Sequence, residues 1–331
     1  MEATRTGRRL LSIDGGGVKG IIPAIVLARL ERVTGRPTRE TFDFIAGTSS
    51  GALTAAALAA GIPAERVVAL YADRSAEVVR KIPILSTTLR ILTGSMYDTA
   101  RLREVIADEL GDAASWTLND APVDILITAK RLEDGMPWYF VRDNPANSCR
   151  AGEFPLVDVV TASAAAPTYF PPYDIPGVGR LIDGGVGVTG NPVYQGCVEA
   201  FEYTDRYRPA ETLVVSLGTG QSLRRPRPTW IWPWLHWLLS ELLRSPAEQQ
   251  TELVHRHYPE APFYRVDVRL DRDVSLDDTA AVPWLRAWGE RLAATLDWGA
   301  ILAGRDLAHR VTAASTLPRE YCRVPPPVVV R

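Results

Sequence analysis

Ser49 is the side chain with the clearest capacity for chemistry, because it lies within the pentapeptide GTSSG at residues 47–51. A strand-like apolar run, residues 42–46, precedes the pentapeptide, and the alanine-rich run 52–60 follows it. A serine on a sharp strand-to-helix turn can project its Oγ as a nucleophile when neighbours such as Gly47 and Gly51 carry no Cβ. The same residues are also typical of a turn in which a serine caps a helix. The pentapeptide alone leaves both interpretations open.

A glycine-rich loop, DGGGVKG at residues 14–20, lies between a strand-like run and a helical pattern. The consecutive glycines Gly15, Gly16 and Gly17 expose backbone N–H groups, which suits an anion or an oxyanion hole. The spacing also satisfies G-x-G-x-x-G, but the next strand runs into the serine pentapeptide instead of ending in an acidic residue for a ribose. A phosphate-binding P-loop is disfavoured because Lys19 is followed by Gly20 and not by Ser or Thr.

Two further motifs follow along the chain. Asp183 begins the tripeptide DGG directly after the apolar Leu181 and Ile182, so its carboxylate can reach the cleft at a strand end. As an isolated motif, DGG is also a common turn signal. The segment SAAAPTYFPP, residues 163–172, is by itself typical of a helix end that breaks into a proline-bounded loop.

Together and in this order, the four motifs resemble those of the patatin-like phospholipase family: a DGGGxRG loop, a GxSxG elbow, an alanine-rich helix with an APTYFPP-like end, and DGG or DGA. The resemblance covers about residues 9–220 and ends with SLGTG at 216–220. It implies that Ser49 is the nucleophile, Asp183 its general base, and the amides of Gly15, Gly16 and Gly17 the oxyanion hole. The residues that it implies as motif support are Asp14, Lys19, Gly20, Gly47, Gly51, Gly184 and Gly185.

The chain departs from the family pattern in two places. Lys19 stands where arginine is usual, which keeps the charge but loses the planar fork. The asparagine pair that commonly follows DGG is represented by Gly190 and Asn191. Neither departure touches Ser49 or Asp183.

The residues themselves leave the identity of the general base open. Serine needs an adjacent base, and histidine usually serves. All four histidines, His236, His255, His257 and His309, follow Asp183, so a triad in the order Ser, Asp, His is formally available. None lies at a glycine-flanked strand end, which favours a Ser49–Asp183 dyad.

The elements that must position these motifs alternate between strands and helices. Strand-like runs are residues 10–13, 42–46, 123–128, 180–182, 212–217 and 263–268, and helical patterns are residues 22–33, 50–60, 99–110, 247–257 and 282–303. This alternation predicts a mainly parallel sheet. With the resemblance, we expect a three-layer α/β/α fold, with a catalytic core at 9–220 and a tryptophan-rich cap or lid with C-terminal helices, residues 221–331, packed on the same domain.

Composition excludes several classes of protein. The 331 residues are 46% hydrophobic and 23% charged, as in a soluble globular protein, and the net charge of −2 gives no general attraction to nucleic acid. Cys149, Cys197 and Cys322 lack metal-ligand spacing, so we expect neither a metal nor another cofactor, and a reducing compartment. No signal peptide or transmembrane run is recognised, which predicts a cytoplasmic protein, with peripheral contact at the inner membrane.

The tryptophan-rich segment is the candidate for that membrane contact. It combines interfacial cations and aromatic groups: Arg224, Arg225, Arg227, Trp230, Trp232, Trp234 and Trp237. Leucines at helical spacing within the same segment are equally consistent with a cap packed over the core.

The leading functional hypothesis is a lipid acyl hydrolase, a phospholipase A or lysophospholipase whose substrate is a phospholipid or lysophospholipid. The main alternative is a patatin-like phospholipase effector of bacterial antiphage defence that a cyclic nucleotide activates, although no motif reveals a nucleotide pocket. A catalytically silent lipid-binding scaffold is disfavoured by the intact Ser49, Asp183 and glycine loop. An acyltransferase usually has a histidine beside the serine, and Thr48 occupies that place.

Overall fold

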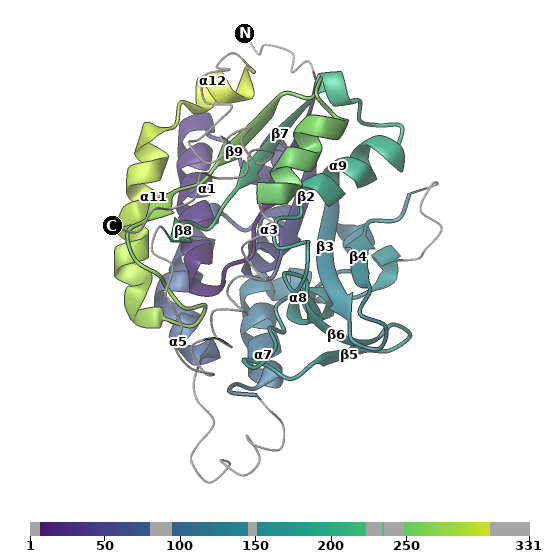
Figure 1. Ribbon diagram of the computed structural model, residues 1–331, viewed down its shortest axis with the longest axis vertical. Helices are drawn as coiled ribbons and strands as arrows, with labels where there is room; N and C mark the ends of the chain where they lie inside the picture. Colours follow the sequence, from purple (N-terminus) through teal and green to yellow (C-terminus); the bar gives the residue numbers. More distant parts are fainter. Residues whose placement is uncertain (1–6, 80–94, 145–150, 223–233, 235–247, 305–331) are drawn as a thin grey trace, which may run out of the picture.

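An eight-stranded sheet forms the centre of the computed structural model, which describes residues 7–79, 95–144, 151–222, 234 and 248–304 (Figure 1). The strand order is β5-β6-β3-β2-β1-β7-β9, and β4 pairs with β3. The strands are β1 (Arg8–Ile13), β2 (Phe44–Thr48), β3 (Asp124–Arg131), β4 (Pro137–Val141), β5 (Tyr173–Ile175), β6 (Gly179–Asp183), β7 (Thr212–Leu217) and β9 (Phe263–Val266). A separate parallel pair joins β8 (Gln221–Ser222) to β10 (Arg269–Leu270).

Both faces of the sheet are buried, which explains why its strands read as nearly continuous apolar runs. Along β1, Leu11 and Ile13 join one hydrophobic cluster, whereas Leu10 joins the cluster on the opposite face. Val215 and Val214 of β7 are divided between the clusters in the same way. The period of two along each strand therefore supplies two separate cores.

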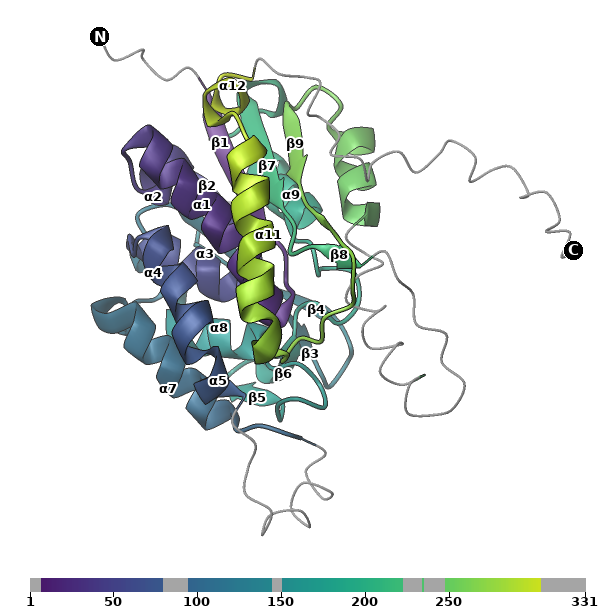
Figure 2. The same cartoon turned by 90° about the vertical axis from the view of Figure 1, so that its left-hand side faces the viewer.

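Helices cover both faces, so the molecule has three layers (Figure 2). The larger layer contains α1 (Ile21–Thr34), α2 (Thr38–Thr41), α3 (Ser50–Ala60), α4 (Ala64–Ala69), α5 (Ser75–Val78), α7 (Thr99–Leu110), α8 (Leu156–Ser163), α11 (Val282–Thr295) and α12 (Trp298–Leu302). A π-helical turn, Leu70–Arg74, continues α4 into α5. The opposite layer contains α9 (Val193–Glu202) and the helical residues 248–257. The expectation of a three-layer fold around a mostly parallel sheet is confirmed.

Several predicted boundaries shift. The strand predicted at 42–46 runs instead from Phe44 to Thr48, because β2 pairs in parallel with both β1 and β3 through Gly47. The single helical pattern at 282–303 is wrong, because the chain leaves α11 at Leu296 and Asp297 caps α12 by accepting a hydrogen bond from the Ala300 N–H. The antiparallel strands β4 and β5 were not predicted.

The strands β2 and β6 converge on β3. Thr48, the last residue of β2, lies across from Thr128, and β2 runs parallel to β3. Asp183, the last residue of β6, lies across from the adjacent Ala129, and β6 runs antiparallel to β3. The two carboxyl ends therefore meet, which brings residue 49 next to residue 183.

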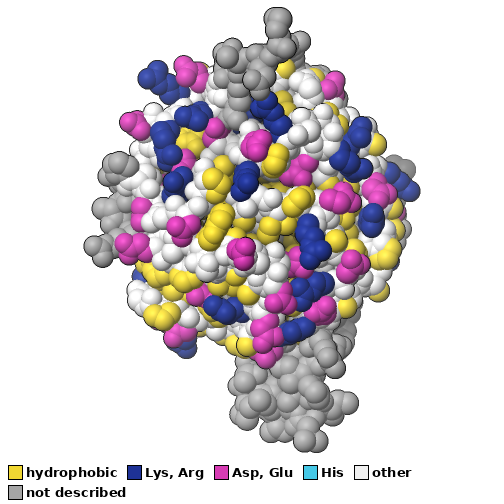
Figure 3. Space-filling view, turned by 180° about the vertical axis from the view of Figure 1, so that it is seen from behind, with side chains coloured by type: hydrophobic (Ala, Val, Ile, Leu, Met, Phe, Trp, Pro, Cys, Tyr) yellow, Lys and Arg dark blue, Asp and Glu magenta, His cyan; other side chains and the backbone are white. Residues whose placement is uncertain are grey.

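The surface on the face opposite to the view of Figure 1 carries acidic and basic side chains that are interspersed with hydrophobic ones (Figure 3). Within the part of the chain that the structure describes, no helix has the length and apolar character needed to cross a bilayer. In the tryptophan-rich segment, Trp234 is helical and 50% exposed. The other predicted membrane-contact residues lie outside the described residues: Arg224, Arg225, Arg227, Trp230, Trp232 and Trp237.

Candidate active site

Ser49 occupies a strained turn between β2 and α3. Its backbone has φ 55° and ψ −124°, one of two positive φ values among the non-glycine residues that the structure describes. Gly47 and Gly51 permit this turn, because a Cβ on Gly51 would collide with the carbonyl oxygen of Ile13 and a Cβ on Gly47 would collide with that of Gly51. The turn places Ser49 at the N-terminus of α3, where the helix dipole favours negative charge.

Asp183 lies within hydrogen-bonding distance of the Ser49 hydroxyl. The Ser49 Oγ donates to Asp183 Oδ2 over 2.6 Å, and the Gly185 N–H donates to Asp183 Oδ1 over 2.7 Å. The Asp183 side chain is 1% exposed. Burial raises the pKa of Asp183 to about 6, although both hydrogen bonds oppose the rise. A carboxylate with such a pKa is ionised at neutral pH and is a stronger base than an ordinary aspartate.

The end of α8 holds both residues in place, a role that the sequence did not reveal. The Ser163 hydroxyl accepts a hydrogen bond from the Ser49 N–H over 2.9 Å, and the Ala165 carbonyl accepts one from the Asp183 N–H over 3.0 Å. Ser163 also accepts the Gly184 N–H through its carbonyl oxygen. The motif at 163–172 therefore positions the Ser49 and Asp183 backbones as well as ending a helix.

The amides of the glycine loop have different surroundings. The Gly15 N–H donates to the carbonyl oxygen of Gly190 over 2.9 Å, and the Gly16 N–H donates to the Ser50 hydroxyl over 3.1 Å. The Gly17 N–H has no acceptor within the described part of the chain, and Gly17 has a φ of 59° that suits glycine. Gly17 and Ser49 line the same pocket.

The remaining motif residues support this arrangement through close packing. Gly20 faces the Tyr71 hydroxyl and Gly184 faces Thr128, in both cases too closely for a Cβ. Lys19 is half-buried in the short 3-10 turn Gly17–Gly20.

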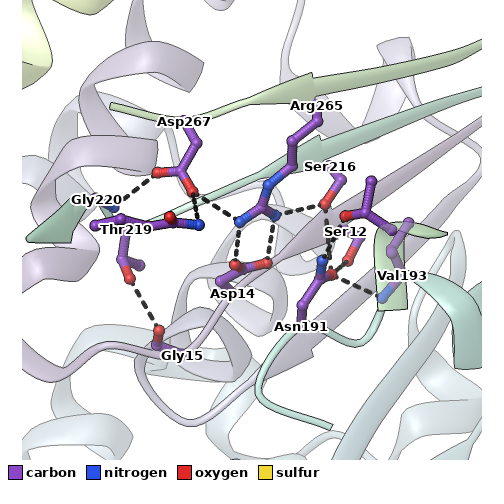
Figure 4. Close-up of polar contacts among 12 residues, drawn as sticks. Ser12, Asp14, Gly15, Asn191, Val193, Ser216, Thr219, Gly220, Arg265 and Asp267 are labelled. Atoms are coloured by element: carbon purple, nitrogen blue, oxygen red, sulfur yellow. Dashed lines mark hydrogen bonds and ion pairs between the residues drawn. The ribbon is translucent and has the colours of Figure 1, made fainter. Parts of the chain in front are cut away.

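Asp14 is bound by Arg265, a residue that no sequence motif had identified. Arg265 on β9 donates to Asp14 Oδ1 over 2.9 Å and to Oδ2 over 2.6 Å, and it also contacts Asp267 (Figure 4). Burial opposes the charge on Arg265, but the two carboxylates outweigh it and raise its pKa above the ordinary value. Asn191, which with Gly190 stands where the family commonly has an asparagine pair, is fully buried and accepts a hydrogen bond from the Val193 N–H.

A pocket that is partly open to solvent adjoins Ser49. Most of its lining is aliphatic or aromatic, and the side chains include Leu53, Val78, Leu102, Val105, Ile106, Ala166, Tyr169 and Phe170. The polar groups at the pocket include Asp277, which accepts a hydrogen bond from Tyr97 over 2.6 Å. Such a lining suits a flexible apolar group whose polar end meets Ser49.

The two described histidines belong to the opposite layer. The His257 Nδ1 shares a hydrogen bond with the Tyr194 hydroxyl at 2.6 Å, and the His255 ring packs edge-on against Phe263. Tyr194 and Phe263 belong to the cluster beneath α9. His236 and His309 lie outside the described residues. No group of three or more metal-ligating side chains was found among the described residues.

Comparison with known proteins places these motifs in a family. Residues 11–195, more than half of the chain, match the model described as Patatin-like phospholipase. A cGAMP-activated phospholipase of Escherichia coli (strain TW11681) is 33% identical over 201 residues, which cover 58% of this chain and 56% of that protein. A cGAMP-activated phospholipase of Vibrio cholerae serotype O1 is 31% identical over 207 residues, 58% of each chain.

A plant protein, patatin group M-3 of Solanum tuberosum, is 31% identical over 235 residues, which cover 64% of this chain and 60% of that protein. The chain thus spans less than two thirds of the length of these curated relatives. Because the family match extends over more than half of its residues, the chain belongs to the patatin-like phospholipase family.

Proposed function

We propose that this protein is a lipid acyl hydrolase that cleaves carboxylic esters of phospholipids or lysophospholipids through Ser49. The observation that carries the proposal is the 2.6 Å hydrogen bond from Ser49 Oγ to a buried carboxylate beside an apolar pocket. The pocket suits an acyl chain, because apolar side chains gain little from contact with a charged or strongly polar substrate. The names of the relatives, which include phospholipases, agree with this substrate class.

The proposed reaction has two halves. In the first, Asp183 takes the proton of the Ser49 hydroxyl while Oγ attacks the ester carbonyl, and the same proton then passes to the departing alcohol. In the second, Asp183 takes a proton from water as the water oxygen attacks the acyl carbonyl. The ester bond to Ser49 then breaks, Asp183 returns the proton to Ser49 Oγ, and the fatty acid is released. The Gly16 and Gly17 amides stabilise the tetrahedral oxyanion in both halves. Gly15 serves this loop through its backbone contact with Gly190.

A lipid digest tests the function directly. Wild type and Ser49→Ala are incubated with vesicles of defined phospholipids and lysophospholipids, and the released fatty acids and lysolipids are identified by mass spectrometry. We expect release by wild type only, and the products will report head group and acyl position. Equal release by Ser49→Ala would refute the proposal.

A second set of variants separates the Ser49–Asp183 dyad from a triad. Asp183→Asn is compared with alanine variants of His236, His255, His257 and His309 on a soluble ester. We expect only the Asp183 variant to lose hydrolysis. An inactive histidine variant that retains its fold, beside an active Asp183→Asn, would assign the base to that histidine.

A switched enzyme is the second candidate, and the observation that favours it is the description of two relatives as cGAMP-activated. Hydrolysis is measured with and without cyclic dinucleotides over a range of concentrations. A rate that rises only in their presence would support regulation by a cyclic nucleotide, whereas an unchanged, measurable rate would favour constitutive activity.

We also propose that residues 224–237 contact the membrane, because this stretch combines three arginines with four tryptophans. Serine replacements of Trp230, Trp232, Trp234 and Trp237 should weaken binding to lipid vesicles while sparing hydrolysis of a soluble ester. Unchanged vesicle binding would favour a packed cap instead.

A further inference from the structure

Three neighbouring strands carry polar residues at the same level of the sheet. Ser12 of β1 lies across from Ser216 of β7, and Ser216 lies across from Arg265 of β9. All three are buried. Their neighbours two residues earlier, including Leu10 and Val214, are apolar and belong to the core beneath α9. This polar row thus interrupts a hydrophobic face of the sheet near the carboxyl ends of its parallel strands, which is the end at which Ser49 lies.

Arg265 connects the two loops that leave β1 and β7. Its guanidinium binds both oxygens of Asp14, the residue that opens the glycine loop, and donates to Asp267 Oδ2 over 2.9 Å. The other oxygen of Asp267 accepts the Gly220 N–H over 2.9 Å. A bidentate arginine has a fixed planar geometry, so it sets orientation as well as neutralising charge.

Thr219 completes the connection by contacting the glycine loop itself. Its hydroxyl donates to the carbonyl oxygen of Gly15 over 3.0 Å (Figure 4). The carbonyl of Gly15 and the N–H of Gly16 belong to one planar trans peptide and point in opposite directions. Holding the carbonyl toward Thr219 therefore directs the N–H to the other side, where it meets the hydroxyl of Ser50, next to the nucleophile.

We propose that Arg265 and Thr219 are positioning residues that fix the Gly15–Gly16 peptide so that the Gly16 N–H faces the oxyanion formed at Ser49. This inference rests on the proposed acyl hydrolysis. It implies that the segment SLGTG, residues 216–220, and the buried Arg265 of β9 influence the rate of hydrolysis by positioning the glycine loop. We call these contacts of Arg265 and Thr219 the clamp. Without it, the Gly15 carbonyl loses the hydrogen bond from Thr219, and the Gly16 N–H is held less precisely toward the developing charge.

The decisive variant is Thr219→Val, which removes the hydroxyl while retaining the branched shape. A displaced oxyanion donor lowers the rate of chemistry more than substrate binding, so we expect kcat on a soluble ester to fall about 10- to 100-fold while KM changes less than about twofold. Thr219→Ser is the matched rescue, because it keeps the hydroxyl, and should retain kcat within about threefold. Wild-type kcat in Thr219→Val, or equal losses in both variants, would overturn the proposal.

Arg265→Lys tests the other half of the clamp. Lysine keeps the charge but cannot bind both oxygens of Asp14 and also reach Asp267. We expect a loss of kcat in this variant as well. If both residues act on one peptide, the double variant Arg265→Lys with Thr219→Val should be little worse than the poorer single variant. Losses that multiply in the double variant would contradict a shared action.

Ser12→Ala is the control for general damage to the polar row. The Ser12 hydroxyl donates to Asn191 Oδ1 over 3.3 Å and does not contact the glycine loop. The kcat of Ser12→Ala should equal that of wild type. A loss of kcat as large as that of Thr219→Val would contradict an effect specific to the clamp. Ser49→Ala is measured in parallel: if it remains active, the proposed function itself fails, and if it is inactive while Thr219→Val is normal, only the clamp fails.

Discussion

Asp14 and Asp183 share a sequence context and differ in what surrounds them. Each is buried, each lies at the carboxyl end of a strand, and each precedes at least two glycines. Both oxygens of Asp14 are bound by the Arg265 guanidinium. The oxygens of Asp183 accept a serine hydroxyl and a backbone N–H, and no cation pairs with it among the described residues.

The difference shows how partners decide what a buried carboxylate can do. A carboxylate neutralised by arginine has both oxygens committed and is fitted to hold structure. Burial raises the pKa of both carboxyls to about 6, even though Arg265 opposes the rise at Asp14. What differs is the partner: Asp183 faces a hydroxyl whose proton it can take, whereas both oxygens of Asp14 accept hydrogen bonds from Arg265. The tripeptide Asp-Gly-Gly therefore does not by itself determine whether its aspartate has a structural or a catalytic role.

The largest effect should follow from removing the base. We expect Asp183→Asn to lower kcat on a soluble ester by about 10⁴-fold, comparable with the loss when a catalytic aspartate is replaced by asparagine elsewhere. Its thermal midpoint should not fall below that of wild type, because a buried carboxylate without a cation costs stability. A variant that unfolds more readily and yet retains activity would reverse the roles assigned to the two aspartates.

Asp14→Asn should chiefly damage the fold. It leaves the buried Arg265 short of one of its two carboxylates, and breaking such a pair typically costs about 3 kcal/mol of unfolding free energy. Chemical denaturation of Asp14→Asn beside Asp183→Asn measures this contrast. Equal stability of the two variants would show that Arg265 and Asp14 contribute no net stabilisation.

The pH dependence of hydrolysis should follow the ionisation of Asp183. Burial raises the pKa of this carboxyl to about 6, and only its ionised form can accept the Ser49 proton. The value of kcat/KM should therefore fall about tenfold per pH unit below this pKa and level off above it. The measurement uses a soluble ester, and the circular dichroism of the wild type over the same pH range is the control for acid unfolding. A fall in kcat/KM that begins above pH 7, or an acidic fall that is lost in a histidine variant, would indicate a different base.

The smallest effect should come from the pocket beside Ser49. Ala166→Trp fills part of the apolar space. We expect the ratio of kcat/KM for long-chain over short-chain esters to fall about 10-fold, in line with the free energy of a few buried methylene groups. Ala210→Trp, on the distant 3-10 turn Pro209–Glu211, is the matched control. An unchanged ratio in Ala166→Trp would remove this pocket from acyl binding.

Much of the central sheet followed from periodicity, because strands buried on both faces leave long apolar runs in the sequence. The runs at 212–217 and 50–60 agree with β7 and α3 at both ends. The short antiparallel strands β4 and β5 were not predicted, because the apolar run of β4 is only four residues long and follows a proline, and β5 has only three residues.

The residues of the candidate site likewise fall into those that the sequence predicted and those that it did not. Ser49 and Asp183 carry local signals, namely glycines that a tight turn requires. Arg265 carries none, because an arginine in the segment FYRV is by composition a surface residue. Ser163 begins the motif at 163–172, but a serine at a helix end is ordinary and does not indicate which backbone it contacts. Their positions depend on contacts between segments that are distant in sequence, such as β9 with the end of β1.

The order of synthesis gives the Asp14–Arg265 contact a further consequence. The two residues lie 251 positions apart, so the ribosome completes Ser49 and Asp183 before it reaches Arg265. Until β9 docks, Asp14 has no contact with the Arg265 guanidinium, and Thr219 alone can hold the glycine loop. On the scheme proposed above, full hydrolytic competence therefore requires that β9 has been synthesised and has docked beside β7.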